Sequence, residues 1–524
     1  MNLVEHLIEQ ARLRPEAPAI VETRAGLDRA TSFAALERRS AQVAARLRDS
    51  GLTPGQAVLI LHPMSVELYA VLLGVFRLGG VAMFLDPAAG REHLERCCEL
   101  QPPDALVASP KAHALRLFSA ALRKVPRKFV IGPWLPGATS LRAAGRNAVI
   151  AGCEPCASEA PALLTFTSGS TGAPKAAVRT HGFLLAQHRV LAHHLQLAPG
   201  EVDLTTLPIF LLAHLASGVT SVIPDADLRS PGTVAAAPVL SQITRLGVTR
   251  VAASPAFFER LLAPAASGPD SLQGLRKIFT GGAPVFPRLL ERLAQAAPHA
   301  LVEAVYGSTE AEPIAHLPVS EMATEDRWTM RKGGGLLTGR PIPEIRLRIL
   351  GDRWGRPIGP FTAGELERAS LPPGQPGEVV VAGDHVLKTY LHGQGAAETK
   401  FSVEGEVWHR TGDAGKLDEQ GRLWLLGRCA ATVRDRRGEL HPFAVECVAM
   451  EHPEVRRAAF VSLKDKRILA VEDESGWNET VATALSQELG WAGLDELRRV
   501  PHLPVDRRHN AKIDYPALRK LLQD

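Results

Sequence analysis

Residues 163–175 read Leu-Leu-Thr-Phe-Thr-Ser-Gly-Ser-Thr-Gly-Ala-Pro-Lys. An apolar run typical of a buried strand leads into small hydroxyl residues and glycines, and the stretch ends on a lysine. Glycines let backbone N–H groups turn toward a polyphosphate, hydroxyl groups add donors, and a lysine adds a positive charge. The spacing matches neither the G-x-x-x-x-G-K-[ST] P-loop nor the G-x-G-x-x-G motif. It predicts a phosphate-binding loop rather than a plain surface loop, with these donors: Thr167, Ser168, Gly169, Ser170, Thr171, Gly172 and Lys175.

Helix-like and strand-like segments alternate around this loop. Apolar residues recur at helical spacing in Phe33–Arg48 and Val66–Leu78. The short apolar runs Ala57–Leu61 and Val81–Leu85 are typical of buried strands. The same rhythm returns between Ser241 and Val305. This alternation predicts parallel sheets covered by helices.

The pattern changes after Gly333, where short β-like runs lie between turn signals and indicate an antiparallel β subdomain. From Arg428 onward, strand-like runs alternate with helical segments at Pro442–His452 and Glu479–Leu489, which suits a small α+β domain. We therefore expect an α/β fold in two domains. Residues 1–427 form a large domain of helix-covered sheets with a β subdomain, and residues 428–524 form a small C-terminal domain.

Composition narrows the function classes. The 524 residues include 60 Lys and Arg against 56 Asp and Glu, and this net charge of +4 argues against a dedicated nucleic-acid binder. The most apolar stretch, Tyr69–Leu85, contains Arg77 and three glycines, so it is too short and broken to span a bilayer. No secretory pattern opens the chain, and a single C-x-x-C (Cys153 to Cys156) is a weak metal signal. We expect a cytoplasmic enzyme.

Five further motifs follow the phosphate-binding loop. With that loop, they resemble the motifs of the adenylate-forming superfamily, which includes acyl-CoA ligases, peptide-synthetase adenylation domains and luciferases. All six occur in the order and spacing of that superfamily and cover nearly the whole chain. The five are Gly281-Gly282-Ala283-Pro284, Tyr306-Gly307-Ser308-Thr309-Glu310, Thr411-Gly412-Asp413, Gly427-Arg428 and Asn510-Ala511-Lys512-Ile513.

This resemblance implies that ATP is a substrate and Mg²⁺ a cofactor, and the residue types suit those roles. The Tyr306 ring can stack on adenine, Thr309 can donate to the α-phosphate, and Glu310 offers an oxygen ligand to Mg²⁺. Asp413 can accept from the ribose hydroxyls, together with Arg428. Lys512 would meet the charge that builds during attack on the α-phosphate. The remaining nucleotide-binding positions implied are Gly282, Ala283, Pro284, Gly307 and Ser308.

Three motifs depart from the superfamily pattern. The resemblance implies that Gly427-Arg428 is the hinge about which the small domain rotates; in the superfamily an acidic pair normally follows, but here Cys429 is followed by Ala430 and Ala431. Ala511 stands where the lysine loop usually has glycine. The usual histidine is missing after the aromatic of the substrate motif, and the nearest is His214. We expect Phe210 and His214 to line the substrate pocket.

Within the superfamily, three stretches resemble the olefin β-lactone synthetases, which also lack the acidic hinge pair. This resemblance implies that ATP activates a hydrophobic carboxylic acid, a fatty or β-hydroxy acid, as acyl-AMP with release of pyrophosphate. An internal hydroxyl then closes a β-lactone without coenzyme A. The stretches are Asp203–Pro208 with Thr220–Asp225, Gly421–Trp424, and Pro504–Ile513.

Three alternatives stay open. An acyl-CoA ligase would use coenzyme A to make a thioester. A stand-alone adenylation enzyme would load a carrier protein in trans, because the twelve residues after Lys512 leave no room for a carrier domain. A nucleotide-binding scaffold without catalysis is disfavoured by the presence of Lys175, Glu310 and Lys512 together.

Overall fold

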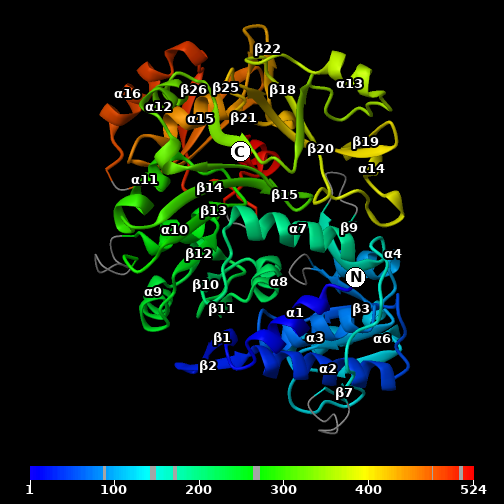
Figure 1. Ribbon diagram of the computed structural model, residues 1–524. Helices are drawn as coiled ribbons and strands as arrows, with labels where there is room; N and C mark the ends of the chain where they lie inside the picture. Colours follow the sequence, from blue (N-terminus) through cyan, green and yellow to red (C-terminus); the bar gives the residue numbers. More distant parts are fainter. Residues whose placement is uncertain are drawn as a thin grey trace. The chain divides into compact units, whose positions relative to one another are not determined.

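The computed structural model describes the chain except for residues 86–89, 142–148, 169–173, 264–271, 475, 507–510 and 524 (Figure 1). The described residues form two compact units. One contains Met1–Asp225 and Asp384–Ala397, and the other contains Ala226–Gly383 and Glu398–Asp524. The two units are defined by the density of contacts within each of them. They do not test the expected domain boundary after residue 427, which stays a prediction. Within the described part of the chain, no helix is long and apolar enough to cross a membrane.

The first unit contains a seven-stranded sheet in the order β7-β6-β5-β3-β4-β8-β9. Its strands from β7 to β8 run parallel, and β9 pairs antiparallel with β8. Helices α2 and α3 begin where Ser32 and Ser65 accept backbone N–H groups. They pack so closely that a Cβ on Gly74 would lie 2.8 Å from Val43. The bounds are β3 (Ala57–Leu61), β4 (Val81–Phe84), β5 (Ala105–Ala108), β6 (Arg127–Val130), β7 (Thr139–Ser140), β8 (Pro161–Ser168), β9 (Pro174–Thr180), α2 (Phe33–Asp49) and α3 (Val66–Arg77).

Four more strands of this unit follow the order β10-β11-β1-β2. The strands β10, β11 and β1 are parallel, and β1 and β2 form an antiparallel hairpin. The bounds are β1 (Pro18–Arg24), β2 (Leu27–Ser32), β10 (Val202–Thr205), β11 (Thr220–Ile223), α1 (Val4–Leu13), α4 (Arg91–Leu100), α5 (Pro110–His113), η2 (Ala114–Leu117), α6 (Ala120–Lys124), α7 (His181–His194), α8 (Pro208–Ser217) and η5 (Leu391–Gly393).

The second unit contains strands in the order β17-β18-β20-β21-β16-β15-β14-β13-β12, and β19 pairs with β20. The strands β12, β13 and β14 are parallel, and the others in this order pair antiparallel. The bounds are β12 (Arg250–Ala253), β13 (Lys277–Gly281), β14 (Leu301–Ser308), β15 (Ala311–Pro318), β16 (Leu336–Pro341), β17 (Arg346–Leu350), β18 (Gly377–Ala382), β19 (Lys400–Val403), β20 (Glu406–Leu417), β21 (Leu423–Arg428), η3 (Pro231–Thr233), α9 (Ala236–Arg245), α10 (Pro255–Leu261), α11 (Pro287–Ala296), η4 (Val319–Glu321), α12 (Thr324–Arg331), α13 (Ala363–Ala369) and α14 (Ala396–Thr399), which spans the boundary between the units.

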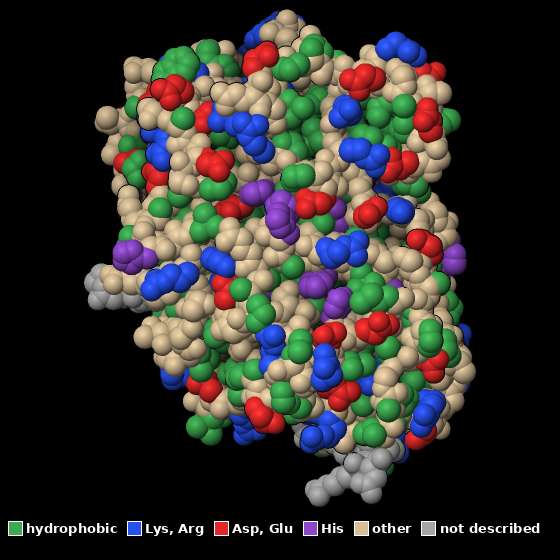
Figure 2. All heavy atoms as spheres, viewed as in Figure 1, with side chains coloured by type: hydrophobic (Ala, Val, Ile, Leu, Met, Phe, Trp, Pro, Cys, Tyr) green, Lys and Arg blue, Asp and Glu red, His purple; other side chains and the backbone are tan. Residues whose placement is uncertain are grey.

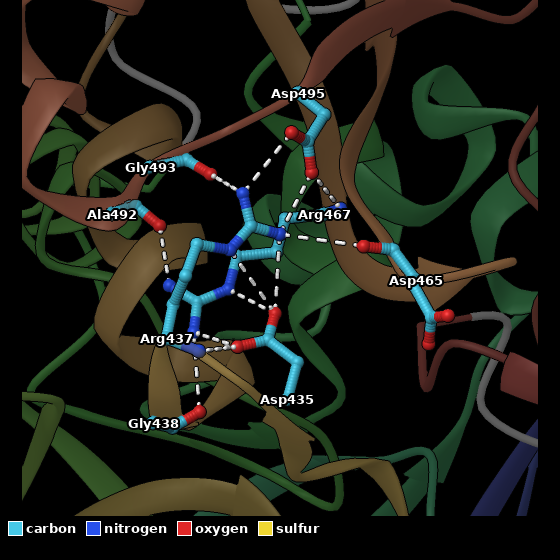
Figure 3. Close-up of polar contacts among 8 residues, drawn as sticks. All are labelled: Asp435, Arg437, Gly438, Asp465, Arg467, Ala492, Gly493 and Asp495. Carbon is cyan, nitrogen blue, oxygen red and sulfur yellow. Dashed lines mark hydrogen bonds and ion pairs between the residues drawn. The ribbon is translucent and has the colours of Figure 1, made fainter.

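The C-terminal residues of this unit form a three-stranded sheet, β24-β25-β26, beside the hairpin β22–β23. Figure 3 shows how charged side chains join them: Asp435 accepts from Arg467 and Arg437, and Asp495 accepts from Arg437 and from the Arg467 backbone. These hydrogen bonds fix the hairpin on the sheet. The bounds are η6 (Cys429–Ala431), β22 (Val433–Asp435), β23 (Gly438–Leu440), α15 (Pro442–Met450), β24 (Val455–Leu463), β25 (Lys466–Asp473), α16 (Glu479–Glu488), η7 (Gly490–Ala492), β26 (Glu496–Arg499) and α17 (Tyr515–Leu521).

These observations confirm the expected α/β fold, with helices between parallel strands, an antiparallel β subdomain after Gly333 and an α+β segment at the C-terminus. Strand β3 matches its predicted bounds, and α2 ends one residue later than predicted.

The β subdomain contains a buried ion pair that offers a test of this packing. Arg410 on β20 donates to both carboxylate oxygens of Glu378 on β18, at 2.6 and 3.1 Å, and both side chains are buried. Burial raises the pKa of Glu378 although Arg410 opposes the shift.

Glu378→Ala leaves the Arg410 charge buried without this partner. We therefore expect the free energy of unfolding of this unit, measured by urea titration, to fall by about 3–5 kcal/mol. Glu367→Ala, which breaks an exposed pair with Arg348, is the control and should cost under about 1 kcal/mol. Equal losses would contradict this account.

Candidate active site

A carboxylate, a phenol and a guanidinium meet in the second unit. Asp413 on β20 lies opposite Arg428 on β21 in the strand register, and Arg428 Nη1 donates to Asp413 Oδ1 at 2.8 Å. The Tyr306 hydroxyl, from β14, donates to Asp413 Oδ2 at 2.7 Å. Desolvation and the Asp413 charge raise the pKa of Tyr306. The Arg428 side chain is 53% exposed, so it is accessible to a ligand.

The backbone before Asp413 takes a shape that depends on glycine. Gly412 has a φ of +69°, and a Cβ there would lie 2.8 Å from the Trp354 ring. The Thr411 hydroxyl donates to the carbonyl of Val379 and accepts from the backbone N–H of Asp413. Each residue of the Thr-Gly-Asp motif therefore has a structural part in orienting the carboxylate.

Thr309 and Glu310 form the two-residue turn between β14 and β15, where Ser308 pairs with Ala311. The Glu310 backbone N–H lies 3.2 Å from Ser308 Oγ, which accepts its hydrogen bond. On the neighbouring strand β13, a Cβ on Gly281 would lie 2.4 Å from the carbonyl oxygen of Val305, so only glycine allows this approach. Gly282, which follows, has a φ of +79°.

Two basic residues near Glu310 were not found by the sequence analysis. Lys400 on β19 pairs with His409 on β20 in the strand register, and both side chains are buried. Burial lowers the pKa of Lys400 to about 7, and the charge of Glu310 opposes the shift. Burial, and then Lys400, lower the pKa of His409 to about 3. No motif contains either residue, and only the strand pairing brings them together.

Lys512 is exposed, and its backbone is fixed by another carboxylate. Asp506 Oδ1 accepts from the backbone N–H groups of Lys512, at 2.8 Å, and Ala511, at 3.2 Å. The Asp506 N–H donates back to the carbonyl of Lys512 at 2.8 Å. Asn510, the first residue of this motif, lies outside the described residues.

A buried contact anchors the chain just after Lys512. The Tyr515 hydroxyl and the Phe460 backbone N–H both donate to Glu446 Oε1, each at 2.9 Å. Burial raises the pKa of Glu446 to about 7. Asp506 and Tyr515 therefore fix the backbone on both sides of Lys512. The sequence gives no sign of either contact, because the partners are brought together only by the tertiary fold.

The first unit holds the predicted phosphate-binding loop. The backbone of Thr167 and Ser168 ends β8, whereas Gly169, Ser170, Thr171 and Gly172 lie outside the described residues. Lys175, on β9, lies against Gly395, where a Cβ would come within 2.3 Å of its Cε. With its φ of +79°, Gly395 thus leaves the space that the lysine side chain occupies.

Phe210 and His214 both lie on α8 and are buried. His214 Nδ1 lies 3.2 Å from Thr205 Oγ1 and 3.1 Å from Ser221 Oγ, inside a buried polar cluster. This arrangement gives His214 a packing role. The expectation that the two residues line the substrate pocket stays a prediction.

The fold is that of a nucleotide-binding enzyme of the adenylate-forming type, and the assignment of the Tyr306–Asp413–Arg428 cluster to its nucleotide site stays a prediction. The chain belongs to the family of AMP-binding enzymes, whose model matches residues 7–391. It is therefore an adenylate-forming ligase or synthetase, and membership of the family implies use of ATP. The resemblance found in the sequence is confirmed.

Two relatives are named olefin beta-lactone synthetase, one from Xanthomonas campestris and one from Stenotrophomonas maltophilia. Each is 31% identical to this chain in an alignment that covers 98% of this chain and 96% of the relative. The solved structure of the amide bond synthetase McbA from Marinactinospora thermotolerans has a TM-score of 0.80, covers 100% of this chain and 99% of its own, and is 24% identical. That similarity shows the fold.

The contacts around Lys512 give a second test. Asp506→Ala removes the acceptor of two backbone N–H groups, so we expect the adenylation rate at saturation to fall about ten-fold or more, with little change in KM. If Asp506 acts through Lys512, it should cause no further loss in the Lys512→Ala background, as measured by pyrophosphate exchange.

Asp514→Ala is the matched control. Asp514 Oδ1 caps α17 by accepting from Ala517 N, so its loss should cost about 1 kcal/mol of stability and leave the rate unchanged. A full additional loss in the double variant would contradict the positioning role of Asp506.

Proposed function

We propose that this enzyme activates a hydrophobic carboxylic acid as acyl-AMP, releases pyrophosphate, and then closes a β-lactone ring on a β-hydroxy acid without coenzyme A. The observation that carries the proposal is the similarity to two olefin beta-lactone synthetases over nearly the whole chain. The departures at the hinge, Ala430 and Ala431, agree with it.

In the first step, a carboxylate oxygen of the acid bonds to the α-phosphorus of ATP while the bond to pyrophosphate breaks. We assign Asp413 and Arg428 to the ribose and Tyr306 to adenine. Lys175 would neutralise phosphate charge, Thr309 would donate to the α-phosphate, and Lys512 would stabilise the negative charge that builds in the transition state.

The donor chemistry at the β14–β15 turn suits Mg²⁺. Glu310 offers a carboxylate oxygen at an accessible turn, which is the type of ligand that magnesium prefers. A bound Mg²⁺ there would neutralise charge on the phosphates. We therefore assign Glu310 as the protein ligand of the metal.

In the second step, the β-hydroxyl oxygen of the acyl-AMP attacks its own acyl carbon. The bond from that carbon to the phosphate oxygen breaks, AMP leaves, and the hydroxyl proton passes to solvent. Intramolecular attack can lower the barrier by up to ~7–11 kcal/mol in well-oriented cases, and strain in the four-membered ring offsets part of this.

Several contacts cross the predicted hinge and join the C-terminal residues to earlier parts of the second unit. Glu451 accepts from Arg331 at 2.8 Å, Arg288 donates to the carbonyl of Val455 at 2.9 Å, and Arg434 pairs with Asp352. Ala430 has no polar side chain that could exchange partners if these residues rotated. We assign this arrangement to both steps, with Lys512 beside the acyl-AMP, and this assignment favours an internal nucleophile.

The role of Lys512 can be tested by substitution. We expect Lys512→Ala to lower acid-dependent exchange of pyrophosphate into ATP by roughly two to three orders of magnitude, or ~3–4 kcal/mol, because the lysine acts on the transition state. ATP affinity should change little, and Lys520→Ala, which removes an exposed lysine on α17, should behave as the unchanged chain. A large loss of ATP binding with full turnover at saturation would instead assign Lys512 a ground-state role.

The second step can be tested by product analysis with a pair of acids of equal length, with and without a 3-hydroxyl group. In the absence of any thiol, the hydroxy acid should give AMP, pyrophosphate and a product one water lighter than the acid. The plain acid should support pyrophosphate exchange but little net turnover. Thioester formation from plain fatty acids with coenzyme A, and no turnover of the hydroxy acid without it, would establish an acyl-CoA ligase instead.

A further inference from the structure

One segment of the first unit carries basic side chains and no acidic ones. No Asp or Glu occurs between Asp104 and Glu154. On the face drawn in Figure 2, acidic and basic side chains are interspersed over most of the surface. Arg127 is used within the fold, because it donates to the carbonyls of Ser50 and Gly51. The basic residues of the segment are Lys111, Arg116, Arg123, Lys124, Arg127, Lys128, Arg142 and Arg146, of which Arg142 and Arg146 lie outside the described residues.

The same segment exposes three large apolar side chains. Leu117, at the end of η2, is 73% exposed, and the adjacent Phe118 is 63% exposed. Trp134, in the turn that follows β6, is 72% exposed. Single exposed apolar residues are ordinary, but three of this size within eighteen residues of one another, among cations only, need an explanation.

Hydrogen bonds and close approaches bring the two parts of the segment together. Arg123 Nη1 donates to the carbonyls of Arg116 and Leu117, at 3.2 and 3.1 Å, which places α6 against η2. The Arg116 guanidinium in turn lies 3.1 Å from where a Cβ on Gly137 would be, so η2 adjoins the turn that contains Trp134. We call the side chains of Arg116, Leu117, Phe118, Arg123, Lys124 and Trp134 the 116–134 surface.

Two acidic side chains of the adjoining helix α4 each have a partner. Glu95 accepts from the backbone N–H of Ala121 at the start of α6, and Glu92 pairs with Arg96 on its own helix. Arg123 and Lys124, in the last turn of α6, are both exposed, so their positive charges face solvent.

We infer that the 116–134 surface binds the surface of an anionic lipid bilayer. Basic side chains are attracted to anionic headgroups, and the amphipathic tryptophan ring with two apolar neighbours can enter the boundary between headgroups and acyl chains. An acidic protein would match the charge equally, but a tryptophan and two apolar neighbours that stay 63–73% exposed among cations favour the bilayer, whose interface takes up such rings without a matching pocket. The inference stands apart from the proposed reaction.

The test measures binding of the full chain to vesicles by co-sedimentation. We expect binding to phosphatidylcholine vesicles that contain phosphatidylglycerol, weaker binding as salt rises, and little binding to phosphatidylcholine alone. Arg123→Glu with Lys124→Glu should lower the partition coefficient at least ten-fold. Leu117→Ser, Phe118→Ser and Trp134→Ser together should lower it about ten-fold or more.

Trp328→Ser is the matched control, because Trp328 is 63% exposed in the second unit beside Glu325 and Asp326. It should bind vesicles as the unchanged chain does. Pyrophosphate exchange in solution should be unchanged in every variant, which shows that each is folded and separates failure of this inference from failure of the proposed reaction. Absence of binding to anionic vesicles would overturn the inference. So would equal vesicle binding by the apolar triple variant, or charge-dependent binding to an RNA homopolymer without vesicle binding.

Discussion

The orientation of one carboxylate, Asp413, organises the site of the second unit. One of its oxygens accepts from Tyr306 and the other from Arg428, so a shift of this residue would disturb both partners. The carboxylate keeps its place because its strand is fixed nearby. Three residues earlier, Arg410 is buried against Glu378, and the ring of Trp354 packs on both Arg410 and the Gly412 backbone. A buried ion pair thus fixes the strand, while a more exposed pair stays accessible to a ligand.

The loop that contains Lys512 likewise combines an exposed charged group with a backbone that is fixed nearby. Lys512 has an exposed side chain on a backbone that Asp506 fixes before it and Tyr515 fixes after it. Burial of the Glu446 carboxyl opposes its ionisation, as its raised pKa shows, and its two neutral donors offset only part of that cost. In the proposed reaction, a fixed backbone with an exposed ammonium group would let the lysine charge meet a ligand at a low cost in conformational entropy.

The sequence predicted the local elements well and the supporting contacts poorly. Strand β3 and helix α2 were placed within one residue, because period and capping are local properties. The family was recognised because each of its motifs is a short run of chemically distinctive residues, and the role of each motif residue stays a prediction. Lys400, His409 and Asp506 were missed, since each acts through partners that only strand pairing or a loop contact supplies. Gly395 is a further example, because nothing in its own stretch indicates that a lysine more than two hundred residues earlier lies against it.

The choice between an internal hydroxyl and a separate thiol as the attacking group depends on whether the C-terminal residues must move after adenylation. An enzyme that hands an acyl group to a separate thiol must admit that thiol after adenylation, and so must move whatever blocks its approach. An internal hydroxyl arrives with the acid and needs no such opening. Three sets of contacts join the C-terminal residues to earlier parts of the second unit, through Arg288, Arg331 and Arg434. If the enzyme used a separate thiol, keeping these contacts throughout the reaction would be a disadvantage, because the C-terminal residues could not move to admit the thiol. With an internal hydroxyl it is an advantage under the role proposed for Lys512, because the lysine and the acyl-AMP would then not have to separate between the two steps.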